Sequence, residues 1–133
     1  MIITCNKDLS YLCLHHNDKD HKTDVVKENT TFIIIDSSEE SVYIVPVGYV
    51  TDGYSIPSMF AWLIKNERVD AALLHDFMCS LADEQNDYKL RQYADKVFSE
   101  YLLLTGVSKW KANVMYFAVS GYAFTSKIFG KYS

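Results

Sequence analysis

The chain has 133 residues, 49% of them hydrophobic, and its 13 basic and 17 acidic side chains give a net charge of −4. This size and composition suit one domain whose core needs no metal or disulfide staples. The acidic balance argues against a protein that binds duplex DNA by neutralising phosphates, so no nucleic-acid partner is expected. Residues 106–133 are an exception, because they carry four lysines and no carboxylate. Such a basic segment can meet an anionic surface or pack on the acidic remainder of the chain.

Cysteine spacing and hydropathy indicate the compartment. Cys5, Cys13 and Cys79 are odd in number and far apart, so they predict neither a disulfide framework nor a zinc ribbon, and a reducing compartment is expected. The first residues lack the basic and apolar regions of a signal peptide. The longest apolar stretch, residues 114–129, is too short and too often interrupted by polar residues to predict a transmembrane helix.

The first part of the chain is β-like. Residues 30–36 (TTFIIID) and 41–50 (SVYIVPVGYV) are rich in β-branched and aromatic residues, and the polar SSEE between them predicts a hairpin. Residues 10–16 can add a strand. The polar residues 17–24 are expected to form a loop.

After Pro57 the hydrophobic period changes from two to 3.6, which indicates helices. Residues 68–82 are predicted to form a helix that is apolar around most of its circumference and therefore central. Residues 88–104 carry a regular amphipathic stripe and form the second helix.

A third helix is expected to run from about Lys109 to Phe129, with Gly106 after the end of the preceding helix and Ser108 as its cap. Its aromatic side chains can form a membrane-interface surface flanked by lysines, or they can fill the core of an aromatic-rich small domain, which is the simpler explanation. These side chains are Trp110, Tyr116, Phe117, Tyr122, Phe124 and Phe129.

The predicted fold class is therefore α+β. A small N-terminal antiparallel β-sheet is expected within residues 1–50, followed by a bundle of about three helices within residues 57–130. The two parts form a single domain over residues 1–133.

The stretches VTDGYSIPSMFAWL (residues 50–63) and LLHDFMC (residues 73–79) place unusual polar groups in apolar surroundings. His75 and Asp76 lie about 100° apart on a helix, so they can flank one pocket. Asp52 can approach it from an Asp-Gly turn, and Asp95 can approach it if the first two helices run antiparallel.

These four side chains predict one base, one carboxylate that orients it, and two carboxylates for a hard cation. Calcium prefers carboxylate and carbonyl oxygens, whereas zinc would want more nitrogen or sulfur. The alternative is a polar core in which the His-Asp pair is mutually satisfied.

The sequence contains two further candidate catalytic sites, and both are less favoured. Ser55 lacks the strand-turn-helix setting of a serine nucleophile, so capping a helix that begins at Pro57 explains it better. His15, His16 and His21 could join His75 and Asp76 in a metal-dependent phosphohydrolase. Such a site would need its first histidine on a helix, whereas these three lie in a polar stretch.

Several separated motifs resemble one known family. The chain contains GYVTDGYSIP, then LLHD, then ADKVF, then GVSKW, and this order resembles the family called domain of unknown function 1353, which occurs in phages and prophages. The resemblance covers about Val45 to Gly121. It implies a phage or prophage origin and no biochemical activity by itself.

A second, more distant resemblance implies a catalytic activity. TDGYS, HDFMC and ADKVF are similar to the loop and helix motifs of prokaryotic phospholipase A2. That resemblance implies that Asp52 and Asp76 ligate calcium, that His75 deprotonates a water, and that Asp95 orients His75. The chain departs from that pattern at Cys79, where the lipase helix carries tyrosine. It also lacks the paired cysteines of the secreted enzymes and adds a β-rich N-terminal third.

Two classes of function follow. The first is a phage-encoded, calcium-dependent acyl-ester hydrolase that meets a lipid or membrane surface. The second is a non-enzymatic virion or tail subunit, or a host-directed binding protein, whose partners are other proteins and whose His/Asp cluster is structural. Either would work in the host cytoplasm or in the virion. Tyrosines expected to be exposed can mark a protein interface in the second class, and these are Tyr11, Tyr43, Tyr49, Tyr54 and Tyr88.

Overall fold

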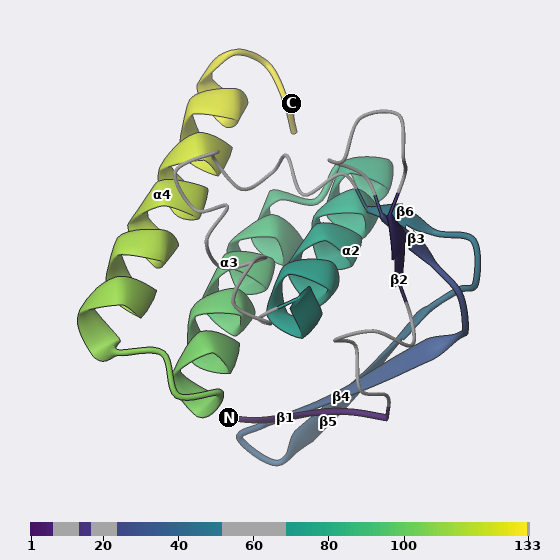
Figure 1. Cartoon of the computed structure of the whole chain (residues 1–133). Coiled ribbons are helices and arrows are strands. Elements are labelled where there is room, and N and C mark those ends of the chain that lie inside the picture. Colours follow the sequence, from purple (N-terminus) through teal and green to yellow (C-terminus); the bar gives the residue numbers. More distant parts are fainter. Residues whose placement is uncertain (7–13, 17–23, 52–68, 133) are drawn as a thin grey trace.

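Two small antiparallel sheets and three helices make up the part of the chain that the structure describes (Figure 1). The structure is a computed structural model, and it describes residues 1–6, 14–16, 24–51 and 69–132. The strands are β1 (Ile2–Cys5), β2 (Leu14–His16), β3 (Asp24–Val26), β4 (Thr30–Asp36), β5 (Glu39–Val45) and β6 (Val50–Thr51), and the helices are α2 (Val69–Gln85), α3 (Tyr88–Leu104) and α4 (Lys109–Ile128). The sheets have the orders β1-β4-β5 and β2-β3-β6. The α+β class, with a small sheet before the helices, is confirmed.

The predicted hairpin is present as β4 and β5. Their antiparallel register runs from Thr30 opposite Val45 to Asp36 opposite Glu39. The turn is shorter than the predicted SSEE, because Ser37 and Ser38 alone make it, with φ angles of 50° and 71°. Two consecutive positive φ angles are what a tight two-residue hairpin turn requires, so the two glutamates that follow belong to β5.

The run 41–50, predicted as one strand, is divided between the two sheets. Pro46 follows β5 and has no N–H to donate to a neighbouring strand. Gly48 then takes a φ of 89° and donates its N–H to the carbonyl oxygen of Val26 at 2.8 Å. The chain therefore leaves the first sheet here and enters the second at β6.

Two short strands were not predicted. β1 pairs with β4, and β3 includes Asp24, which the sequence assigned to a loop. Both strands depend on partners distant in the chain, so no local pattern marks them. β2 lies within the predicted strand 10–16. The expected helix start at Pro57, with Ser55 as its cap, lies outside the described residues.

The two helices α2 and α3 form an antiparallel hairpin (Figure 1). α2 continues three residues beyond the predicted end at 82, so the connection is only Asn86 and Asp87. Asn86 has a φ of 51°, and the Asp87 side chain accepts a hydrogen bond from the N–H of Leu90 at 3.0 Å. This cap begins α3 sharply, because it satisfies one of the free N–H groups of the first turn.

The bounds of α3 and α4 follow the sequence closely. Gly106 has a φ of 94° just after α3, as expected for a helix C′ position. Ser108 occupies the N-cap position of α4, but its side chain makes no capping hydrogen bond.

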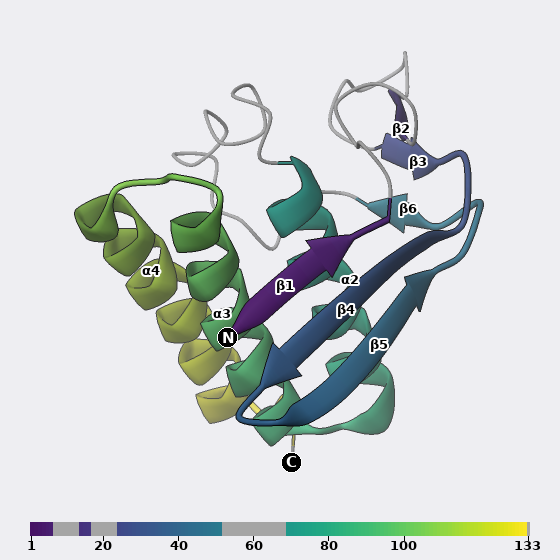
Figure 2. The same ribbon diagram turned by 90° about the horizontal axis from the view of Figure 1, so that it is seen from below.

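The core lies between the sheet β1-β4-β5 and the helices. Figure 2 shows this sheet lying across α2 and α3, and α3 lying between α2 and α4. Phe32 of β4 is fully buried and meets the ring of Tyr101 on α3 edge to face, with centroids 6.3 Å apart. α2 is buried without a break from Ala71 to Asp76, as expected of a central helix.

The last helix does not bury its aromatic side chains. α4 packs through Ala112, Met115, Val119 and Ala123, which are at most 1% exposed. The core explanation is therefore wrong for five of the six aromatic residues, which are exposed: Trp110, Phe117, Tyr122, Phe124 and Phe129. None of the helices in the described ranges has both the length and the apolar character that a membrane span requires.

Replacing Phe32 by alanine should lower the free energy of unfolding by about 3–5 kcal/mol, because the change removes a buried ring and leaves a cavity against Tyr101. Urea titration followed by circular dichroism measures this loss. Ile44 on β5 is 55% exposed, so Ile44→Ala is the matched control and should cost less than about 1 kcal/mol. Equal losses in the two variants would contradict this account of the core.

Candidate active site

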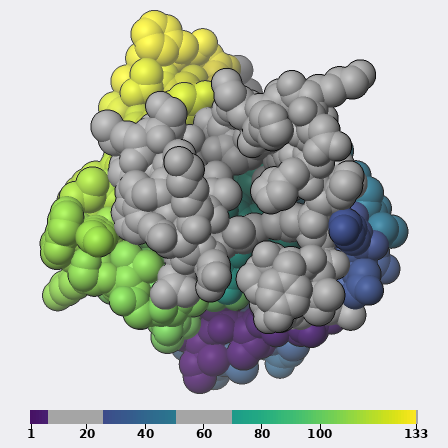
Figure 3. Space-filling model, viewed as in Figure 1, coloured from purple at the N-terminus to yellow at the C-terminus, as the bar shows by residue number. Residues whose placement is uncertain are grey.

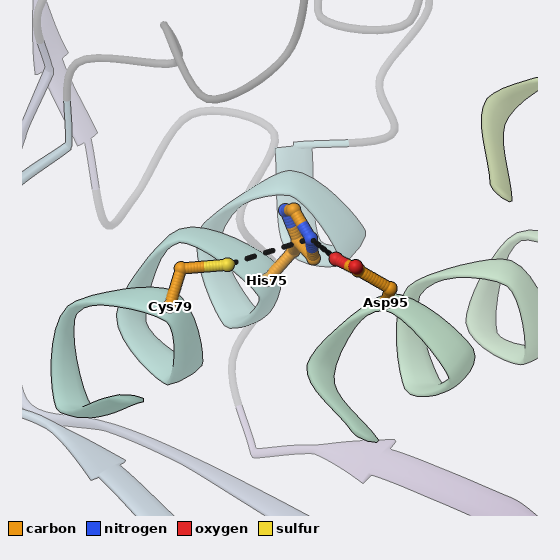
Figure 4. A group of neighbouring side chains, drawn as sticks. All are labelled: His75, Cys79 and Asp95. Atoms are coloured by element: carbon orange, nitrogen blue, oxygen red, sulfur yellow. Dashed lines mark hydrogen bonds and ion pairs between the residues drawn. The ribbon is translucent and has the colours of Figure 1, made fainter. Parts of the chain in front are cut away.

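A histidine from α2 and an aspartate from α3 meet in the interior. His75 Nε2 lies 2.7 Å from Asp95 Oδ1, and each residue is 1% exposed (Figure 4). The antiparallel run of the two helices makes this contact possible. The sequence-based expectation that Asp95 approaches His75 is therefore confirmed as geometry.

This contact decides which imidazole nitrogen carries the proton. An ionised carboxylate only accepts hydrogen bonds, so we assign the proton to Nε2 of His75, which donates to Asp95 Oδ1. Nδ1 then holds the lone pair. It is buried and has no hydrogen-bond partner among the described residues. Phe98 lies against the imidazole, with ring centroids 4.7 Å apart, and helps to hold its plane.

Arg91 supplies a second partner for the aspartate. Its Nε donates to Asp95 Oδ1 at 3.2 Å from one helical turn away, and Arg91 is 2% exposed. Burial alone would lower the pKa of Arg91, but the negative charge of Asp95 and its hydrogen bond to the guanidinium act in the opposite direction, and the pKa is raised. The guanidinium therefore stays charged and balances the carboxylate. The sequence analysis assigned no role to Arg91, and its i, i+4 spacing from Asp95 was the available signal.

Cys79 lies near the same imidazole nitrogen as Asp95. Its Sγ lies 3.5 Å from His75 Nε2, one turn along α2 (Figure 4). Burial raises the pKa of this thiol far above its ordinary value. The side chain is therefore a neutral thiol at physiological pH and contacts the base rather than acting as a nucleophile.

Asp76 points to different surroundings. Its Oδ2 accepts a hydrogen bond from the Tyr49 hydroxyl at 3.3 Å, and that hydroxyl also lies 2.8 Å from Ser80 Oγ. Tyr49 is only partly exposed and packs on Phe77, so the expectation of a freely exposed tyrosine is wrong. Asp52, the other predicted metal ligand, lies outside the described residues.

A family model described as "Protein of unknown function (DUF1353)" matches residues 26–119. The chain belongs to the DUF1353 family. The matched segment contains His75, Arg91 and Asp95, and the family description names no activity. No curated protein and no solved structure matches the chain.

The buried cluster of this DUF1353 protein was tested as a metal centre. His75, Cys79 and Asp95 each offer a ligand atom, and these atoms lie within 4.8 Å of one another. Nitrogen, sulfur and oxygen would suit zinc. Two features oppose it: the 2.7 Å contact is a hydrogen bond, and Arg91 already provides the positive charge. The hydrogen bond and the adjacent guanidinium therefore make this cluster a poor cation site.

Replacing Arg91 by methionine should destabilise the protein by about 3–5 kcal/mol, because the Asp95 charge is left buried without compensation. Combining it with Asp95→Asn should cost at least about 1 kcal/mol less than the sum of the two single changes. Urea unfolding of the four proteins completes the cycle. Lys131→Met is the control, since Lys131 and Asp83 form an ion pair that is 41% exposed at each side chain and should contribute at most about 1 kcal/mol. Additive losses would contradict the coupling.

The thiol predicts an alkaline loss of stability. A raised pKa in the folded state means that the unfolded thiol ionises first, so stability is constant below the ordinary thiol pKa, about 8.5, and falls as pH rises above it. The Cys79→Ala variant should show a shallower fall there, measured as the urea midpoint against pH. Cys5→Ala at a partly exposed cysteine is the control and should keep the wild-type slope. Identical slopes in all three proteins would remove Cys79 as the cause.

Proposed function

We propose that this DUF1353 protein is an acyl-ester hydrolase in which His75 is the general base and Asp95 orients it. The observation that carries the proposal is the asymmetry of the imidazole: Nε2 is held by Asp95 Oδ1 at 2.7 Å, while Nδ1 has a lone pair and no partner among the described residues. A base held at one nitrogen by a carboxylate and left without a partner at the other has the free acceptor that general-base catalysis requires.

The chemical step follows from this arrangement. Nδ1 of His75 takes a proton from water as the water oxygen bonds to the ester carbonyl carbon. Asp95 stabilises the imidazolium through the Nε2–H hydrogen bond. The tetrahedral intermediate then expels the alcohol oxygen, which receives the proton back from Nδ1. The products are a carboxylic acid and an alcohol, and no covalent intermediate on the protein is needed.

The proposed substrate is a lipid ester and the proposed cofactor is calcium. Both rest on the TDG, HD and D-x-x-F resemblance to prokaryotic phospholipase A2. Asp52 and Asp76 would hold the ion, and the carboxylate of Asp76 suits its preference for oxygen. When bound, calcium would polarise the ester carbonyl. The Tyr49 hydroxyl lies 3.3 Å from Asp76 Oδ2 and the Ser80 hydroxyl lies 2.8 Å from that of Tyr49, so further oxygen atoms lie near this proposed ligand.

The test is release of fatty acid from phospholipid vesicles in the presence of calcium. Replacing His75 by glutamine should lower the rate by about 10² to 10⁴, the usual contribution of a general base. The Asp95→Asn variant should also lose activity, because the imidazole is no longer held in its reactive orientation. Asp83→Asn removes an exposed carboxylate of α2 and should keep the wild-type rate.

Thermal melting distinguishes a variant that has lost hydrolase activity from one that has lost its fold. The His75→Gln protein should retain a cooperative transition, and calcium should raise the melting temperature of the wild type but not of Asp76→Asn. Unchanged fatty-acid release by a folded His75→Gln protein would overturn the base assignment. No effect of calcium on the wild-type melting temperature would overturn the cofactor assignment.

The second candidate is a structural cluster in a non-enzymatic phage component. It is favoured by burial, since His75, Arg91 and Asp95 are each at most 2% exposed. In that case the wild type releases no fatty acid with or without calcium, and the same substitutions lower only stability. The resemblance to a phage and prophage family supports a viral origin under either candidate. Mass spectrometry of purified virions tests whether the protein is one of their components.

A further inference from the structure

The helix α4 has two apolar faces, and only one of them is covered. Counting 100° per residue, the buried Ala112, Met115, Val119 and Ala123 lie on one side of the helix. The opposite side carries a second apolar stripe with spacings of four, three, four, three and four residues. This outer stripe consists of Trp110, Val114, Phe117, Gly121, Phe124 and Ile128.

The outer stripe is in contact with solvent along its whole length. Phe117 is 71% exposed and Trp110 is 66% exposed. A Cβ built at Gly121 would meet no other atom within 4 Å, so the stripe is open at its centre too. Figure 2 shows α4 as the outermost helix, packed on α3, and Figure 3 shows it forming one edge of the molecule. Contiguous exposed apolar side chains of this kind mark an interaction surface.

The charged residues beside the outer stripe indicate which kind of partner it binds. Residues 106–133 contain four lysines and no carboxylate. Lys109 and Lys127 lie on one flank of the outer stripe, and Lys111 lies on the other. All three are exposed. The fourth lysine, Lys131, lies 3.2 Å from Asp83, and the ammonium group of Lys127 lies 4.4 Å from the ring centroid of Tyr88. Long lysine side chains beside aromatic residues suit an anionic surface, because their stems can lie along apolar groups while the ammonium groups reach the negative charges.

The same charges decide against a second copy of the chain as the occupant. Two antiparallel α4 helices would bring Lys109 and Lys111 of each copy toward Lys127 of the other, and this segment has no carboxylate to compensate them. Charge also separates α4 from the other exposed apolar face, the outer side of sheet β1-β4-β5, where Val42 and Ile44 lie on the strand that begins with Glu39 and Glu40. Those glutamates would be repelled by an anionic surface.

We propose that α4 docks the protein on an anionic lipid bilayer, with the outer stripe in the headgroup region and the lysines on the lipid phosphates. The proposal rests on α4 alone. It is independent of the hydrolase proposal, because none of its residues belongs to the His75 site.

Vesicle flotation tests the docking directly. The protein should float with vesicles of phosphatidylglycerol and phosphatidylcholine in equal parts, and should bind pure phosphatidylcholine at least about tenfold more weakly. High salt should weaken the binding, since it screens the lysines. The anionic vesicles should shift tryptophan emission to the blue, and Trp110→Phe should remove that shift. Folded protein that does not bind the anionic vesicles would overturn the proposal.

Paired variants locate the surface. Phe117→Ser with Phe124→Ser should weaken binding to the anionic vesicles by at least about tenfold. Val42→Ser with Ile44→Ser removes two exposed apolar side chains from β5 and should bind as the wild type does. Melting curves show whether both proteins are folded, and all four side chains are exposed. Loss of binding in the β5 variant instead, or unchanged binding in the α4 variant, would exclude α4 as the docking surface.

Light scattering tests whether a second copy of the chain, rather than a bilayer, binds the outer stripe. A dimer that forms with increasing protein concentration, disappears in the Phe117→Ser and Phe124→Ser variant, and is accompanied by no vesicle binding would assign the stripe to a second copy and overturn the proposal. A protein that stays monomeric in solution and binds the anionic vesicles through α4 would support it. Neither result depends on fatty-acid release, so the docking and hydrolase proposals can fail separately.

Discussion

The hydrogen bond between His75 and Asp95 joins the two helices that cover the sheet, and the polar interior depends on it. Each partner comes from a different helix, so rotating α2 or α3 would leave a buried imidazole or carboxylate unpaired. Burying an ionised carboxylate costs several kcal/mol unless an opposite charge and hydrogen bonds compensate it. Arg91 provides both from the next turn of α3. The contact therefore opposes other arrangements of these helices as well as stabilising this one.

The same contact leaves the two nitrogens of the imidazole in different environments. Asp95 holds only Nε2 of the imidazole. One atom in each of the three side chains, Nδ1 of His75, Nη2 of Arg91 and Oδ2 of Asp95, has no hydrogen-bond partner among the described residues. Nδ1 is left with a lone pair inside an apolar environment, where an unsatisfied polar atom is costly. Cys79 and Phe98 hold the ring at its sides without supplying a partner for that nitrogen. The proposed role of His75 as a general base rests on this unpartnered acceptor.

The covered and exposed sides of helix α4 carry different kinds of apolar residue. Its covered side consists of Ala112, Met115, Val119 and Ala123, none of them aromatic, and packs against α3. The bulky Trp110, Phe117 and Phe124 are placed outward, where a folded monomer gains nothing from them. A helix whose larger apolar residues face solvent is arranged for contact with something outside the domain. The apolar character of its sequence therefore concerns interaction as much as folding.

Local pattern determined much of this protein: the hydrophobic periods, the Gly106 stop and the β4–β5 hairpin follow from residues close together in the chain. The approach of Asp95 to His75 was also predictable, since it needs only two antiparallel helices. The tertiary structure decided the rest. β1 and β3 exist through distant partners, and Arg91 became a counter-charge only when Asp95 was buried beside it. The aromatic residues of α4 face solvent because periodicity shows that a helix has an apolar face, whereas packing against α3 selects which of two apolar faces is covered.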